Sequence, residues 1–106
     1  MDDTTYHRLA DQTLAHLADA LEAAYDDGKL EDLELEGSVL TIITAAERTL
    51  VVSKHAPSQQ IWLASRQSGG LHFSAGENGG WQLSDGRTLD AVLAHELAHD
   101  GIAVTL

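Results

Sequence analysis

The stretch Asp32-Leu33-Glu34-Leu35-Glu36-Gly37-Ser38-Val39-Leu40-Thr41-Ile42-Ile43-Thr44 predicts the sheet around which the chain is organised. Residues 32–36 alternate between acidic and apolar side chains, which is the period-two pattern of a half-buried strand. A Gly-Ser turn follows, and residues 39–44 form a second, more apolar run. Strands joined by so short a turn pair antiparallel. The stretch therefore predicts a β-hairpin whose first strand turns its acids outward.

Further strands follow this hairpin along the chain. Runs of apolar and β-branched residues predict strands at 49–54, 59–65 and 70–74, separated by short segments rich in Gly, Pro and Ser. A short sixth strand is predicted around Trp81. Connections this short favour antiparallel neighbours throughout, so we expect a single antiparallel sheet of five to six strands.

A helix is predicted on each side of these strands. Apolar residues recur at three- and four-residue steps over residues 4–25, with Thr4 or Thr5 as a cap. The same period follows a cap at Thr88 and ends near Gly101. The order helix, strands, helix is typical of an α+β fold in which both helices cover one face of the sheet. The other face is then free for function.

Length and composition limit the class of protein. The chain has 106 residues, 43% of them apolar, which suits one domain over residues 1–106. It has no cysteine, which excludes disulfides, thiol nucleophiles, Cys-ligated zinc and an iron–sulfur cluster of its own. Met1-Asp2-Asp3 is acidic where a signal peptide needs basic residues, and no apolar run reaches about 20 residues. We therefore expect a cytoplasmic protein with no membrane partner.

Negative charge is concentrated in the first third of the chain. The net charge is −11, and residues 1–36 hold 11 of the 17 acids but 2 of the 6 Lys and Arg residues. Nucleic acid is an improbable partner because binding phosphates needs a basic surface. On the first predicted helix, Asp11, Asp19, Glu22 and Asp26 fall within an arc of about 80°. This ridge of carboxylates suits a basic protein face or a hard metal cation, and it also suits simple solubility.

The second predicted helix carries the string His95-Glu96-Leu97-Ala98-His99. H-E-x-x-H on a helix is the zinc-protease pattern, in which two histidines bind the metal and the glutamate activates water. Catalytic zinc needs a third protein ligand, and only residues 100–106 follow, of which Asp100 is badly placed. Both histidines project roughly 95–135° away from the apolar stripe, whereas Glu96 lies close to it. We therefore expect Glu96 to be a partly buried salt-bridge member, and a small zinc-dependent hydrolase is kept as an alternative.

The segment from Gln59 to Gly70, with the core Gln-Ile-Trp-Leu followed by Ser-Gly, carries a family resemblance. Together with other segments it makes the chain similar to frataxin, in its bacterial, CyaY-type branch. The resemblance covers nearly the whole chain. The other matching segments are Tyr6-His7-Arg8-Leu9-Ala10-Asp11, Gly37-Ser38-Val39-Leu40-Thr41-Ile42, Lys54 to Pro57, and Ser84-Asp85-Gly86 before the helix from Leu89 to Leu97.

The resemblance implies a two-layer α-β sandwich that binds iron weakly at its acidic surface. It also implies contact with the cysteine desulfurase and the scaffold protein of iron–sulfur cluster assembly, as an iron donor or regulator without a catalytic centre. A monomer is expected, with iron-dependent oligomers. An acidic adaptor that binds no iron is a further alternative. The predicted iron-binding residues are His7, Asp11, Asp19, Glu22, Asp26, Asp27, Glu31 and Asp32.

Some of these residues have a second interpretation. His7 lies one turn before Asp11, so the two side chains form either a metal-binding pair or a solvated helix face. The alternation around Trp62 allows it to point outward as a binding anchor or inward as a core residue; the resemblance favours the outward register. Trp81 is expected to be structural. The residues predicted to bind a partner are Asp19, Glu22, Asp26, Gln60 and Trp62.

Overall fold

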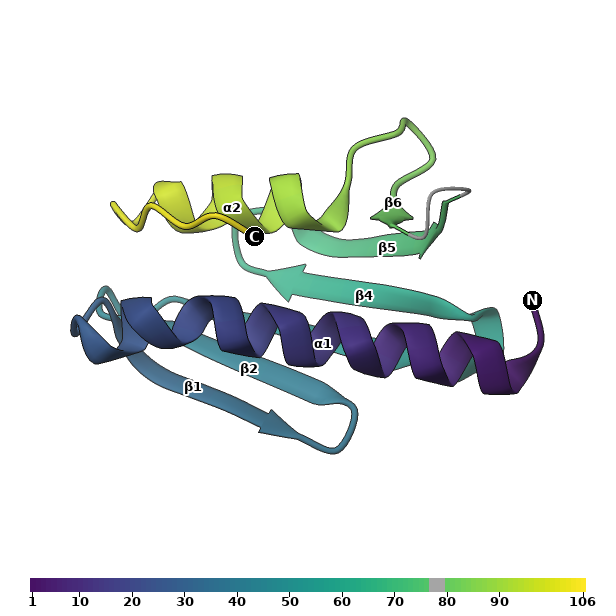
Figure 1. Cartoon of the computed structure of the whole chain (residues 1–106). Coiled ribbons are helices and arrows are strands. Elements are labelled where there is room, and N and C mark those ends of the chain that lie inside the picture. The colour runs from purple at the N-terminus through teal and green to yellow at the C-terminus, as the bar shows by residue number, and fades with distance from the viewer. Residues whose placement is uncertain (77–79) are drawn as a thin grey trace.

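The computed structural model of the chain describes residues 1–76 and 80–106. Within these ranges the chain forms helices at both ends and a sheet between them (Figure 1). The elements in chain order are α1 (Asp3–Asp26), β1 (Leu30–Glu36), β2 (Val39–Thr44), β3 (Thr49–His55), a 3₁₀ turn (Ala56–Ser58), β4 (Gln60–Ser65), β5 (Gly69–Ala75), β6 (Trp81–Gln82) and α2 (Leu89–Ala98). In the described ranges, neither helix is long and apolar enough to cross a membrane.

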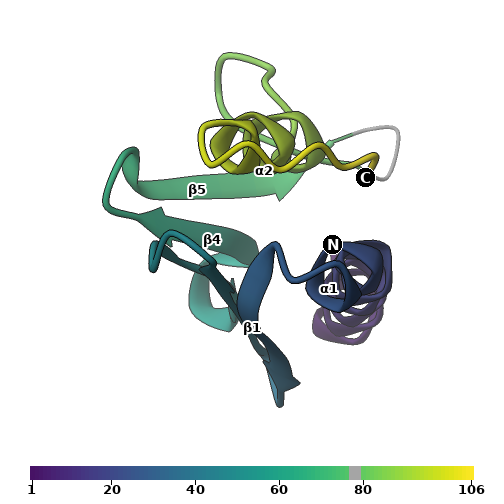
Figure 2. The same cartoon turned by 90° about the vertical axis from the view of Figure 1, so that its left-hand side faces the viewer.

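The sheet is an antiparallel meander. Its strands lie in the order β1-β2-β3-β4-β5-β6, so each strand pairs with its neighbours in sequence. Both helices lie on one face of this sheet and leave the opposite face uncovered (Figure 2). The prediction of a two-layer α-β sandwich with both helices on one face is confirmed.

Helix α1 begins at Asp3, one residue before the range 4–25 that the sequence pattern predicted. The N-cap is Asp2, whose Oδ1 accepts a hydrogen bond from the backbone N–H of Thr5 at 2.8 Å. The prediction of Thr4 or Thr5 as the cap was wrong, because an aspartate carboxylate just upstream satisfies the same unpaired backbone donors. The helix ends before Gly28, whose φ of +77° suits the left-handed conformation that closes a helix.

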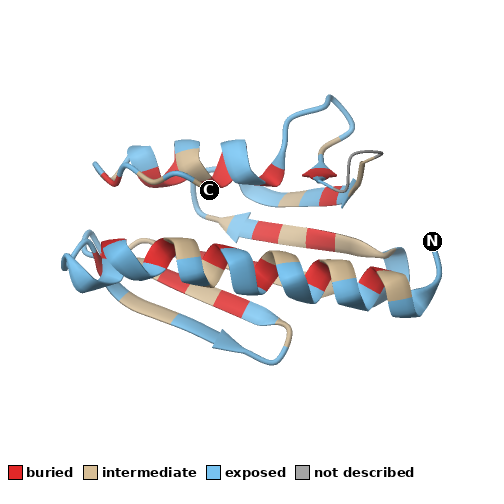
Figure 3. Cartoon of the chain, viewed as in Figure 1, coloured by how far each residue is buried: buried red, intermediate tan, exposed pale blue. Residues whose placement is uncertain are grey.

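The core is the layer between the helices and the sheet (Figure 3). One stripe of α1 is buried and consists of Tyr6, Ala10, Leu14, Leu17, Leu21 and Ala24. The strands contribute alternate residues, such as Ile61 and Leu63 of β4, which are both fully buried. Burying a large aliphatic side chain contributes about 1.5–3 kcal/mol, so this face fixes the register of each strand.

Helix α2 closes the other half of this layer. Thr88 caps it, as predicted, by accepting a hydrogen bond from the backbone N–H of Ala91 at 3.2 Å. Gly101, with a φ of +76°, turns the chain back at the C-terminal end. Ile102 is then buried against the same core, so the C-terminal residues pack between the two helices (Figure 2).

Candidate functional site

The predicted iron-binding acids lie along the outer side of α1 and on the neighbouring strand β1. We use the name acidic surface for Asp11, Asp19, Glu22, Asp26, Asp27, Glu31 and Asp32. Asp32 is half-buried and the other six are exposed. In residues 1–76 and 80–106 there is no group of three or more His, Cys, Asp or Glu side chains placed to hold a metal ion. The acidic surface is therefore open, and its carboxylates do not converge into a cage.

The His7 and Asp11 side chains are brought together, but around a cation of the protein itself. The Nζ of Lys54 lies 2.8 Å from Asp11 Oδ1 and 3.1 Å from His7 Nδ1. A metal ion bound by this pair has to displace the Lys54 ammonium. Sequence reasoning missed Lys54, although its position in β3, two residues after the buried Val52, placed it on the helix-covered face. The free carboxylates of the acidic surface therefore begin beyond Asp11.

Strand β1 adds two acids that the predicted set omitted. Glu34 and Glu36 alternate with Asp32, so the three carboxylates stand on one side of the strand. A side-chain hydrogen bond with Glu36, and then the negative charges of Glu36 and Asp32, raise the pKa of Glu34. The alternation of residues 32–36 already predicted this row of acids. The repulsion between carboxylates crowded in this way is reduced by a bound cation as well as by a proton.

The uncovered face of the sheet carries Trp62 at its centre. Its indole lies between two imidazole rings: the ring centroids are 3.7 Å from His55 and 4.1 Å from His72, with the planes 13° and 12° from parallel. Trp62 is half-buried, while its strand neighbours Ile61 and Leu63 are fully buried on the other face. The outward register predicted for Trp62 is the one observed.

Gln60 holds this tryptophan in place. Its Oε1 accepts hydrogen bonds from Trp62 Nε1 at 3.0 Å and from Ser58 Oγ at 2.9 Å, and its Nε2 donates to Ser74 Oγ at 3.2 Å. From the helix layer, the Tyr6 hydroxyl donates to the Gln60 carbonyl at 2.7 Å. The Trp62 surface, which we define as Trp62, Gln60, His55 and His72, is therefore preorganised on a rigid strand.

The two histidines of this surface were not predicted. His72 is directly opposite Trp62 in the pairing of β4 with β5, and His55 is opposite Gln60 in the pairing of β3 with β4. Both positions depend on strand register, which the turns of this sequence do not specify residue by residue. An outward tryptophan with histidines on both neighbouring strands was the only signal available.

The H-E-x-x-H string does not form a hydrolytic site. Glu96 is buried and accepts hydrogen bonds from Ser65, Ser68 and Arg48, whereas His95 and His99 are exposed on the other side of α2. Burial alone raises the pKa of Glu96, but the hydrogen bonds from Ser68, Ser65 and Arg48 outweigh it and lower the pKa. The prediction of Glu96 as a buried salt-bridge member is confirmed, with Arg48 Nη1 3.2 Å from Glu96 Oε2. The glutamate cannot activate a water bound near the histidines.

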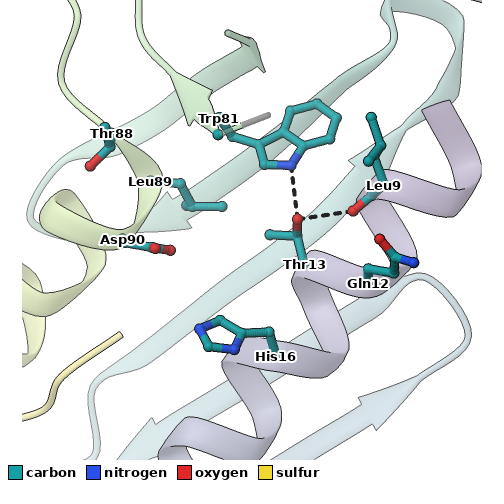
Figure 4. A pocket seen from close by; sticks show the side chains of 9 residues that line it. Leu9, Gln12, Thr13, His16, Trp81, Thr88, Leu89 and Asp90 are labelled. Atoms are coloured by element: carbon teal, nitrogen blue, oxygen red, sulfur yellow. Dashed lines mark hydrogen bonds between the residues drawn. The ribbon is translucent and has the colours of Figure 1, made fainter. Parts of the chain in front are cut away.

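A cavity of about 310 Å³ lies between the two helices (Figure 4). Trp81 forms part of its wall and donates from Nε1 to Thr13 Oγ1 at 2.9 Å. Trp81 is buried, so the prediction that it is structural is confirmed. The cavity opens on the helical layer, and its lining includes no residue of the acidic surface or the Trp62 surface.

These features together define a class: a two-layer α-β sandwich with an open acidic side and an aromatic anchor on its uncovered sheet face. A family model described as the frataxin-like domain matches residues 1–101. The chain belongs to the frataxin-like domain family. This family is associated in general with iron and with iron–sulfur cluster assembly, and it is non-catalytic in general.

Individual relatives are consistent with this family. The mitochondrial frataxin homolog of Saccharomyces cerevisiae is 41% identical over 96 residues, which cover 87% of this chain and 54% of the relative. The chain therefore spans about half the length of that curated relative. A structure of trimeric yeast frataxin complexed with ferrous iron has a TM-score of 0.76 and 36% identity, and the match covers 87% of this chain and 84% of the yeast chain.

A bacterial structure shows the same fold at lower identity. Frataxin from Psychromonas ingrahamii has a TM-score of 0.85 and 24% identity, over 98% of this chain and 96% of that chain. At this identity the likeness shows the fold alone.

Proposed function

We propose that this protein binds iron(II) weakly at the acidic surface and acts as an iron donor or regulator in iron–sulfur cluster assembly. The observation that carries the proposal is the open row of carboxylates on α1 and β1, in a chain of the frataxin-like family. Two properties of this row matter, its oxygen donors and its exposure. The protein has no catalytic centre of its own in this proposal.

The donor atoms suit the metal and its release. Iron(II) accepts carboxylate oxygens, and exposed carboxylates without a cage bind a cation weakly and exchange it quickly. A carrier has to release its cargo, so weak binding is an advantage for this role. Because the chain has no cysteine, it holds no cluster itself and has to deliver iron or regulate the assembly on another protein.

Two surfaces of the protein are available for partners. Asp19, Glu22 and Asp26 offer negative charge to a basic patch, which we assign to the cysteine desulfurase. Trp62 and Gln60 offer a rigid aromatic anchor, which we assign to a second contact with the scaffold protein. The two surfaces belong to different layers of the sandwich, so one molecule of this protein can engage both partners at once. We place this activity in the cytoplasm.

The metal assignment is tested by titrating iron(II) under anaerobic conditions and following backbone amide signals. We expect the signals of Asp19, Glu22, Asp26, Asp27 and Asp32 to broaden first. Asp11 should respond at higher concentration because Lys54 neutralises it. Raising the salt concentration should weaken binding, since exposed charges are screened over about 10 Å at 0.1 M.

Matched variants separate this surface from general negative charge. Asp19→Asn with Glu22→Gln and Asp26→Asn should weaken iron(II) binding. Asp85→Asn with Asp90→Asn, which removes exposed acids from the other end of the chain, should leave it unchanged. Equal losses in both variants would contradict the assignment to α1 and β1.

The oligomeric state is tested by sedimentation. We expect the metal-free protein to be monomeric, and the same measurement on the iron-loaded protein shows whether iron drives oligomer formation.

A further inference from the structure

His95 and His99 form a pair on α2 that the proposed function does not use. They are one helical turn apart and both are exposed, and their ring centroids are 5.0 Å apart with the planes at 89°. His99 is the C-cap residue and keeps helical backbone angles, with φ −61° and ψ −28°. The pair therefore sits on one regular turn of helix, where side chains four residues apart face the same direction.

The spacing of the two rings fits a shared metal ion. Zinc and similar ions bind imidazole nitrogen at about 2.0–2.1 Å, and the nitrogen is roughly 1.1 Å from the ring centre. Two imidazoles on one ion then have centroids roughly 4.5 Å apart at the 90° angle of a tetragonal site and roughly 5 Å apart at a tetrahedral angle. The observed centroid distance of 5.0 Å lies within about half an ångström of both values, so rotation of the side chains is enough for both rings to bind one ion.

The electrostatic surroundings favour a cation at this place. The aligned peptide dipoles of a helix give its C-terminal end a partial negative charge. Arg48, which binds beside Glu96, and Arg87, which lines a pocket together with His95, are both paired with carboxylates: Arg48 Nε lies 3.0 Å from Asp100 Oδ2, and Arg87 Nε lies 2.9 Å from Asp85 Oδ2. The chain as a whole carries a net charge of −11, which attracts cations over longer distances.

The donor set determines which ion is favoured. Glu96 points into the fold and Asp100 is held by Arg48, so neither carboxylate joins the pair. Two imidazole nitrogens suit late first-row divalent ions, and affinity for such a site rises from iron through nickel to copper and falls at zinc. We propose that His95 and His99 form a chelating site for a late first-row divalent ion, with copper(II) bound most tightly and nickel(II) and zinc(II) next. The remaining coordination positions are open to water or to a ligand from another molecule.

This site is separate from the one proposed for iron. The acidic surface offers oxygen donors on α1 and β1, and the histidine pair offers nitrogen donors on α2. The protein therefore sorts metal ions by donor type: iron(II) goes to the carboxylates and copper(II) to the imidazoles. Failure of one assignment leaves the other standing, because the two are tested with different ions and different variants.

The test is a copper(II) titration by calorimetry, with glycine present as a weak competing chelator, combined with electron paramagnetic resonance. We expect one site per chain and two equatorial imidazole nitrogens. Either His95→Gln or His99→Gln should weaken copper(II) binding roughly 10- to 100-fold, because the second imidazole binds within the same molecule only when both are present. His16→Gln, which removes an exposed histidine of α1 with no histidine one turn away, should change the affinity little.

A relocated histidine tests the spacing itself. Ala91→His combined with His95→Ala keeps two exposed histidines on α2 but puts them about 12 Å apart along the axis, too far for one ion. This double variant should bind copper(II) as weakly as His95→Gln. Full affinity in the double variant, or an equal loss in His16→Gln, would overturn the proposal. So would a spectrum with only one imidazole nitrogen in the unmodified protein.

Discussion

The Glu96 carboxylate is ionised inside the fold because hydrogen-bond donors surround it. Ser65 and Ser68 approach one oxygen and Arg48 the other, and the Arg48 guanidinium also donates to the Glu96 backbone carbonyl. Arg48 further binds Asp100, so a single side chain from the β2–β3 connection holds both the last turn of α2 and the segment just after it. Removing one partner of such a network leaves the others buried and unpaired.

The first prediction concerns Glu96. Replacing it by Ala should lower the free energy of unfolding by about 3–5 kcal/mol, because the Arg48 charge loses its buried partner. Glu96→Gln should cost less, about 1–3 kcal/mol, since the amide oxygen still accepts a hydrogen bond. Urea unfolding measures both values. If neither variant were less stable than the parent, the network would not contribute to stability.

The same residue predicts a pH dependence. The folded-state pKa of Glu96 is lowered from 4.5, and that of Asp100, held by Arg48, is lowered from 3.8. A lowered pKa means that the unfolded chain binds more protons, so this stabilisation is present above about pH 4.5 and is lost as the pH falls through the folded-state values. In Glu96→Gln the decline in stability below pH 4.5 should be shallower.

The second prediction compares the two tryptophans. Trp81→Ala should cost about 3–5 kcal/mol, because it empties a buried site beside Thr13. Trp62→Ala should cost less, about 1–2 kcal/mol, since it removes stacking with two imidazoles from a half-buried position. Thermal unfolding gives both values. The Trp62 variant should remain folded and lose affinity for its partner by faster dissociation, measured by surface plasmon resonance.

At the scale of one element, β1 combines an apolar inner row with a row of acids. Its edge is otherwise open to pairing with another chain, and charged side chains on an edge strand discourage such pairing. The acids also repel one another, which is why the pKa of Glu34 is raised. The repulsion between the acids of β1 therefore lowers the stability of the folded protein somewhat, while it keeps the edge strand charged.

The third prediction follows from this repulsion. A pKa raised on folding means that the folded chain binds the extra proton, so the Glu34 contribution is favourable below about pH 4.5 and is lost as the pH rises through the folded value. Glu34→Gln should therefore raise the melting temperature at pH 7 and leave it nearly unchanged at pH 3.5. Glu47→Gln, at an exposed turn position, is the matched control. A lower melting temperature at pH 7 would argue against crowding.

Element boundaries show what local sequence could and could not predict. The strands of the hairpin and the cap of α2 at Thr88 followed from alternation and turn residues alone. The cap of α1 was missed because residues 2–5, Asp-Asp-Thr-Thr, are all capping residue types, so local sequence does not single out Asp2. The His55-Trp62-His72 stack and the Lys54 ion pair depend on which residues face each other across elements, and that information is not local.

At the scale of the whole molecule, the charge of α1 and the aromatic anchor Trp62 lie in different layers. The acids of α1 belong to the helix layer, and the Trp62 surface belongs to the uncovered sheet face, which Asp32 of β1 shares by strand register. Complementary charge acts mainly on the rate of encounter, whereas a buried anchor acts on the rate of dissociation. Substitutions of the α1 acids should therefore change the association rate, and substitutions of Trp62 should change the dissociation rate.

The fourth prediction tests this division. Replacing Asp19, Glu22 and Asp26 by Lys should slow association with the cysteine desulfurase and reduce its salt dependence, with little change in dissociation. Lysine at both Asp85 and Asp90, two charge reversals outside the acidic surface, serves as the control and should have a smaller effect per charge reversed. Stopped-flow mixing at low and high salt measures both rates. An unchanged association rate for the triple variant would remove the electrostatic role of the acidic surface.

The meander also has a consequence for how the chain is made. Each strand pairs with the next one along the chain, so the sheet closes through short loops with a small entropic cost. Helix α1 instead makes its hydrogen bonds to residues far along the chain. Tyr6 bonds to Gln60 at a separation of 54 residues, and Thr13 bonds to Trp81 at a separation of 68 residues. During synthesis α1 is made before the strands, so its apolar stripe has no sheet to cover it until they exist. Charged side chains favour solubility, so we expect the carboxylates along the other side of α1 to keep this segment soluble before the protein has folded.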